Sequence, residues 1–138
     1  MKIIELYQVK KNKRGVFHKN GVKLEPHEEK TARFLVLYGF NIEAIRPVNT
    51  PKVKNPDILM SGTIWEMKAP IKYNENTLKK RMKKASKQAK KVIFDFRNMK
   101  KDYDEAQRYA TKLFKGNHEM RRMIVITKDK KVLDFYKR

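Results

Sequence analysis

The sequence contains no cysteine among its 138 residues. It therefore has no disulfide framework, no thiolate zinc site and no cysteine nucleophile, and cysteine usage leaves the cellular compartment open. No apolar run is long enough to cross a bilayer. The apolar start of the chain is interrupted by Glu5 and Gln8 and lacks a small-residue cleavage site. We expect a soluble chain without a signal peptide and without membrane insertion.

Acidic residues are also scarce. The chain has 15 Asp plus Glu against 35 Lys plus Arg, which gives a net charge of +20. This charge exceeds what solubility requires and is typical of a protein that binds a polyanion. With 40% hydrophobic residues the chain can still bury a core, and its length suits one domain. We predict a single domain over residues 1–138 whose partner is nucleic acid.

The order of the expected elements predicts an α/β fold, a mixed β-sheet flanked by helices. Residues 1–25 are expected to form an N-terminal β-arm with a hairpin around Asn20-Gly21, and residues 26–138 to form the α/β core. Helices are expected from Pro26 to the residue before Gly39, over 77–91, and from Asp102 to about Gly116, the last with Glu105 in capping-box spacing. The expected strands of the core are 40–48, the two arms of a hairpin within 56–68, and 92–96, 123–127 and 132–136.

The hairpin within residues 56–68 carries the main functional prediction. If Ser61-Gly62 forms a two-residue turn, Met60 lies opposite Thr63 and Asp57 lies opposite Glu66, with Lys68 on the same face. Two opposed carboxylates repel one another, which a structural hairpin has little reason to tolerate. A hard divalent cation, Mg²⁺ or Mn²⁺, would turn that repulsion into a binding site.

The chemistry of such a site is the cleavage of phosphodiester bonds. Asp57 and Glu66 would bind the metal, with Met67 adding its backbone carbonyl, and the metal would lower the pKa of a bound water. Lys68 would hold that water or offset negative charge that develops on the phosphate. The other face of the hairpin is apolar and suited to packing against helices; it carries Ile58, Met60, Trp65 and Met67.

Other residues are candidates for the site or its surroundings. Glu28 shares the inward stripe of the first helix, where it either points at the metal or complements the helix N-terminus. The helix over 77–91 is densely basic outside its inward stripe, which favours phosphate binding. The candidate substrate contacts are Arg46, Lys52 and Lys54 in the loop before the hairpin, and Thr77, Arg81, Lys84 and Gln88 on the basic helix.

These residues carry a resemblance to a known family. The core pattern resembles the PD-(D/E)xK nuclease superfamily, and a wider pattern is similar to the tRNase domains at the C-termini of CdiA-type contact-dependent growth inhibition toxins. That pattern comprises Pro26-His27-Glu28, Pro56 to Gly62, Trp65-Glu66-Met67-Lys68, Asn76-Thr77 and Ala85-Ser86-Lys87-Gln88-Ala89.

The resemblance implies an active site of Glu28, Asp57, Glu66 and Lys68, with Thr77 and Gln88 near it, and tRNA as substrate. It further implies a domain that is delivered at the end of a long secreted protein, acts in the cytoplasm and is neutralised by an immunity protein.

Three alternatives remain open from the residues alone. A metal-free ribonuclease could use His18, His27 or His118 as acid and base, since imidazole titrates near neutrality. A non-catalytic nucleic-acid binder needs only the basic helix. A DNA endonuclease could use the same metal and lysine, because recognition of the 2′-hydroxyl depends on contacts that the sequence does not place.

Overall fold

The computed structural model describes residues 4–45 and 58–137, and Arg46, Lys52, Lys54 and Asp57 lie outside this part of the chain. Within it the chain forms eight strands and three helices. The strands are β1 (Ile4–Val9), β2 (Phe17–His18), β3 (Ile42–Ala44), β4 (Ile58–Met60), β5 (Thr63–Lys68), β6 (Lys91–Asp95), β7 (Arg122–Ile126) and β8 (Val132–Lys137). The helices are α1 (Pro26–Val36), α2 (Glu75–Gln88) and α3 (Tyr103–Gly116).

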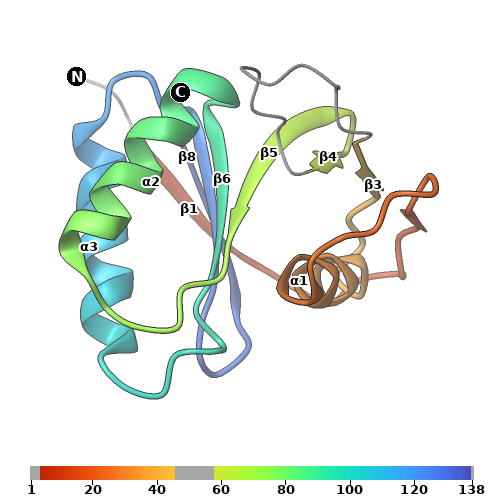
Figure 1. Ribbon diagram of the computed structural model, residues 1–138, viewed down its shortest axis with the longest axis horizontal. Coiled ribbons are helices and arrows are strands. Elements are labelled where there is room, and N and C mark those ends of the chain that lie inside the picture. Colours follow the sequence, from red (N-terminus) through yellow and green to blue (C-terminus); the bar gives the residue numbers. More distant parts are fainter. Residues whose placement is uncertain (1–3, 46–57, 138) are drawn as a thin grey trace.

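All of these strands belong to one mixed sheet, in the order β1-β8-β7-β6-β5-β4-β3-β2. The centre, β5-β6-β7, is parallel, and α2 and α3 provide the crossovers that parallel neighbours require. Figure 1 shows α2 and α3 side by side on one face of the sheet and α1 on the other. The prediction of an α/β fold with a mixed sheet flanked by helices is therefore confirmed.

Each face of the sheet buries its own hydrophobic core, because successive side chains of a strand point to opposite faces. On β6, Val92 and Phe94 pack in the core under α2 and α3, while Ile93 packs in the core under α1. The predicted inward residues of α1, Ala32, Leu35 and Val36, are buried in the second core. Because helices cover both faces of β6, its sequence from Val92 to Phe94 is continuously apolar.

The β4–β5 hairpin forms with the predicted register. Ser61 and Gly62 both have positive φ, 51° and 83°, as a type I′ turn requires, and Met60 pairs with Thr63. The predicted apolar face is confirmed as well, since Trp65 and Met67 are buried in the core under α1 together with Ile58 and Met60.

The first 25 residues differ from the prediction. A turn does form at Asn20-Gly21, closed by a hydrogen bond from Val22 N to Lys19 O of 2.9 Å, but no strand follows it. The hairpin was wrong because β2 pairs in parallel with β3 instead of with residues 22–24. β1, which was not predicted, pairs with β8 at the opposite end of the sheet.

Two helix starts also differ from the sequence-based expectations. α2 begins at Glu75, and the side chain of Asn74 caps it by accepting from Thr77 N at 3.0 Å, so Thr77 lies within the first turn. Asp102 does precede α3, but its φ of 59° is left-handed and its side chain makes no cap hydrogen bond. The capping box with Glu105 was therefore wrong, because that motif needs an extended N-cap residue.

Candidate active site

Glu66 and Lys68 lie on the face of β5 that α2 covers. They pair across the parallel ladder with Val92 and Phe94, whose side chains belong to the core under α2 and α3. The Glu66 side chain is only 2% exposed, and its Oε2 lies 3.7 Å from the Lys68 ammonium, which is 22% exposed. The structure thus brings two predicted catalytic groups together, the buried Glu66 carboxylate and the partly exposed Lys68 ammonium.

The basic helix presents a second group of predicted residues beside this pair. Leu78, Met82 and Ala85 face the sheet, so helical geometry puts Thr77, Arg81, Lys84 and Gln88 along one flank of α2. The other flank, with Lys79 and Lys83, meets α3 in a shared groove. α3 packs on β8 through the Phe114 and Phe135 rings, and α2 contacts β5 and β6, so the flank with Arg81 and Lys84 is on the side of β5.

Burial distinguishes the members of that flank. Arg81 and Lys84 are half-buried, whereas Thr77 and Gln88 are exposed. A half-buried cation beside β5 adds positive potential near Glu66 and Lys68, and its effect is screened less than that of a cation in full solvent. Among the four predicted contacts on α2, Arg81 and Lys84 are therefore the two that the fold partly buries.

Glu28 occupies the N-terminal cap of α1. Its Oε1 accepts a hydrogen bond from Glu25 N at 3.0 Å, and the Glu25 side chain accepts from the backbone of Glu28, which forms a reciprocal capping box. Glu28 thus has the helix-terminus contact considered for it. α1 packs on the face of the sheet opposite to the one that carries Glu66.

The predicted pairing of Asp57 with Glu66 can be followed only in part. The register is confirmed up to Ile58, which lies opposite Trp65, and Asp57 itself lies outside the described residues. The same holds for the three predicted substrate contacts in the preceding loop, Arg46, Lys52 and Lys54.

The donors around Glu66 suit a hard cation. A buried carboxylate and the neighbouring Met67 carbonyl offer the oxygen atoms that Mg²⁺ prefers. Within residues 4–45 and 58–137 no group of three or more His, Asp or Glu side chains gathers to hold a metal. An ion bound here would therefore depend on few protein ligands from this part of the chain, which fits Mg²⁺ because it usually keeps several of its waters.

The apolar face of the hairpin also carries cations. Arg122 and Lys91 lie over the Trp65 ring at 5.4 and 5.9 Å from its centroid. The hydrogen bonds that Arg122 donates to the Asp134 carboxylate raise the pKa of the Arg122 guanidinium. Burial, followed by repulsion from Arg122, lowers the pKa of Lys91. Here the cations cover a buried tryptophan, and Arg122 is already paired with a carboxylate.

The three histidines are exposed and lie on separate elements. His18 is on β2, His27 is in the first turn of α1, and His118 is in the connection between α3 and β7. Five strand steps separate β2 from β7 in the sheet. This arrangement gives no support to a histidine acid–base pair.

One polar cluster was not anticipated from the sequence. The buried Asp95 accepts a hydrogen bond from Thr31 Oγ1 at 2.7 Å and is bridged by Arg97, whose Nη2 lies 2.7 Å from Asp95 Oδ2. Arg97 also stacks over Phe34 at 4.1 Å. The signal in the sequence was an acid at the end of an apolar strand. In the structure the cluster ties α1 to the carboxyl end of β6.

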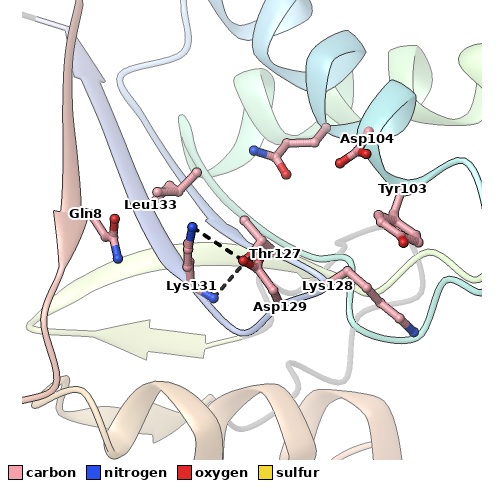
Figure 2. A pocket seen from close by; sticks show the side chains of 9 residues that line it. Gln8, Tyr103, Asp104, Thr127, Lys128, Asp129, Lys131 and Leu133 are labelled. Atoms are coloured by element: carbon pink, nitrogen blue, oxygen red, sulfur yellow. Dashed lines mark hydrogen bonds and ion pairs between the residues drawn. The ribbon is translucent and has the colours of Figure 1, made fainter.

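A further hollow lies at the β7–β8 turn and is shown in Figure 2. Asp104 and Asp129 line it together with Lys128 and Lys131, and Thr127 donates to Asp129. The Thr127 hydroxyl is the main cause that lowers the pKa of Asp129. Charges of both signs neutralise each other there, so this hollow lacks the positive character of the surface beside β5.

Comparison with known proteins identifies the family. A sequence model described as "Contact-dependent growth inhibition CdiA C-terminal domain" matches residues 54–132. This match covers more than half of the chain and includes the hairpin, α2, β6, α3 and β7. The chain belongs to the CdiA C-terminal domain family. Its membership agrees with the family resemblance seen in the sequence and supports a toxin activity of a nuclease type in general.

A solved structure shares the fold. A chain of the "CdiA-CT/CdiI toxin and immunity complex from Burkholderia pseudomallei" is similar over 86% of this chain and 98% of that chain, with a TM-score of 0.63 and 18% identity. No curated protein matches the sequence. Among the described helices of this CdiA C-terminal domain, none combines the length and apolar character needed to span a bilayer.

Proposed function

We propose that this CdiA C-terminal domain is a metal-dependent endonuclease that cleaves structured RNA, with tRNA as the substrate. The observation that carries the proposal is the buried Glu66 beside Lys68 at 3.7 Å, on a hairpin whose register runs as expected up to Ile58 opposite Trp65. The Glu66 carboxylate is buried, lies next to an ammonium, and sits on a strand flanked by cations. This arrangement suits the binding of a metal ion and a phosphate better than it suits a structural role alone.

The proposed roles follow from the chemistry of the groups. Glu66 and Asp57 hold Mg²⁺ or Mn²⁺, with the Met67 carbonyl as a further oxygen ligand. When bound, the metal polarises the phosphate and supplies an activated water. Lys68 orients that water or offsets charge on the phosphate, since its ammonium lies at the surface end of the pair. Glu28 on α1 is the further proposed catalytic residue of this site.

The positive surface supports a polyanionic substrate. Arg81 and Lys84 lie on the flank of α2 beside β5, and Lys80 and Lys87 face solvent on the same helix. Such a row of cations binds phosphates by releasing counterions, so the affinity for RNA should fall steeply with salt concentration. Arg46, Lys52 and Lys54 extend the proposed contacts, with Thr77 and Gln88 at the two ends of the flank.

The decisive experiment compares substrates and metals directly. Purified protein is incubated with total tRNA and with duplex DNA, each with Mg²⁺ or with a chelator. Cleavage of tRNA alone, and only with metal, supports the proposal. Cleavage of DNA selects the DNA endonuclease, cleavage in chelator selects the metal-free mechanism, and binding without cleavage in either metal leaves only a nucleic-acid-binding domain.

We also propose that an immunity protein neutralises this domain, because the solved structure with the same fold is described as a toxin and immunity complex. A net charge of +20 favours an acidic partner whose association is accelerated by electrostatic steering. The proposed setting is a toxin that is delivered by a longer secreted protein and acts in the cytoplasm. Inhibition of tRNA cleavage by an acidic immunity protein, weakening as salt rises, is the expected result.

A further inference from the structure

A cavity lies where the strand that carries Lys68 ends. The loops that follow the neighbouring parallel strands β5 and β6 enclose a cavity of about 610 Å³, lined by Ile71, Lys72, Tyr73, Lys100, Lys101 and Asp102. In open α/β sheets ligands bind in crevices outside the carboxyl ends of the strands, and both loops leave the sheet at that edge. The cavity is also large enough for a small organic group.

One wall of this cavity is apolar. Ile71 is 67% exposed, more than the other exposed large hydrophobic residues of the described chain. Tyr73 stands beside it, held by an edge contact with the Tyr109 ring at 6.4 Å and by a hydrogen bond from its hydroxyl to Glu75 at 3.1 Å. One exposed isoleucine is ordinary, but an isoleucine and a fixed aromatic ring in the same hollow form a surface for a flat apolar group.

The rim of the cavity is charged. Lys72, Lys100 and Lys101 are exposed cations on the two loops, against the single acid Asp102. Asp102 has a left-handed φ of 59°, and its carboxylate does not cap α3. It can therefore accept hydrogen bonds from a ligand's amino group. An apolar wall, three cations and one acceptor match the base and phosphates of a nucleotide.

The chain itself ties this cavity to the candidate active site. Three peptide steps separate Lys68 from Ile71, so their Cα atoms lie at most about 11 Å apart. An RNA chain with one phosphate at Lys68 can thus place a neighbouring base in the cavity.

We propose that this cavity binds an unpaired nucleotide of the RNA substrate next to the cleaved bond, with its base against Ile71 and Tyr73 and its phosphates against Lys72, Lys100 and Lys101. The proposal rests on the proposed endonuclease function for its substrate. It adds that cleavage is directed to unpaired regions of the RNA, because a base held in a duplex stack cannot enter the cavity.

Binding to RNA tests the cavity without requiring cleavage. Ile71→Asp removes the apolar wall and adds a negative charge, and the matched control is Leu6→Asp, at a residue 54% exposed on the edge strand β1. Both changes are made in a Glu66→Gln background with chelator present. The probe is a fluorescent RNA hairpin with an unpaired loop, compared with a blunt duplex of the same length.

We expect Ile71→Asp to weaken hairpin binding about tenfold more than Leu6→Asp does, as the loss of one stacked base would, with no such difference on the duplex. Equal losses for the two variants would overturn the proposal, and so would a tenfold effect that is the same on hairpin and duplex. Circular dichroism establishes that both variants fold. If the unmodified protein cleaves no RNA, the endonuclease function fails, while this comparison still decides the cavity.

Discussion

Replacing Glu66 by Gln tests the candidate active site most directly, because it removes the charge of a buried side chain while keeping its size. Glu66 lies 3.7 Å from the Lys68 ammonium, a separation at which two unit charges attract by about 4.5 kcal/mol at an effective dielectric constant of 20. Burying the carboxylate costs several kcal/mol in lost hydration, so the two contributions nearly cancel.

We therefore expect Glu66→Gln to change the free energy of unfolding of the metal-free protein by no more than about 1 kcal/mol. For a chain of this length that corresponds to a shift of about 4 °C in Tm. Cleavage of tRNA should in contrast fall at least about 100-fold, because loss of a metal ligand removes several kcal/mol of transition-state stabilisation. If Glu66 is a metal ligand, the substitution lowers cleavage and leaves Tm nearly unchanged. If Glu66 is a structural residue, it lowers Tm.

The assay measures thermal unfolding in chelator and tRNA cleavage in Mg²⁺ on the same preparations. Glu43→Gln is the matched control, since it removes an exposed carboxylate from β3 in the same sheet and should leave both quantities unchanged. A Tm that falls by 10 °C or more would make Glu66 a structural residue, at about 2.5 kcal/mol. Full cleavage by Glu66→Gln would refute its assignment as a metal ligand.

Three further predictions concern stability and metal binding. Asp95→Asn should lower the free energy of unfolding by about 3 kcal/mol in chemical denaturation, because it leaves the largely buried Arg97 without its ionised partner; a loss below 1 kcal/mol would contradict this. Gly15→Ala should cost about 2 kcal/mol, since a Cβ there would lie 2.1 Å from the Phe40 carbonyl oxygen, whereas Gly116→Ala meets nothing within 4 Å and should not destabilise. Mg²⁺ at 100 times its Kd should stabilise the protein by about 2.7 kcal/mol, and Asp57→Asn should abolish that shift in a thermal melt; equal shifts in both proteins would remove Asp57 from the metal site.

Local patterns were enough to predict the centre of the fold. The glycine after Ser61 fixed the turn, the turn fixed the register, and alternation then put Trp65 and Met67 on the apolar face, because side chains of a strand alternate with a period of two residues. The stripe of Leu78, Met82 and Ala85 predicted the buried face of α2 for the analogous helical reason.

The errors arose where the deciding contact is distant in sequence. The Asn20-Gly21 turn looked like a hairpin turn, but β2 pairs with β3, whose partner residues Ile42 and Glu43 follow a whole helix later. β1 could not be predicted at all. Its sequence has no clear polar and apolar alternation, and it forms a strand only by pairing with β8 at the other end of the chain. Asp95 and Thr31 form their hydrogen bond across 64 residues for the same reason.

The sequence by itself determined the charge, the α/β class, the hairpin register and the identity of Glu66 and Lys68 as neighbours on one face, because each depends on composition or on residues close along the chain. Only the tertiary structure decided that this face lies under α2, that Glu28 caps a helix packed on the other face, and that the loops after β5 and β6 enclose a cavity. Those features depend on which surfaces meet when the sheet is covered, and burial against distant partners is what selects them.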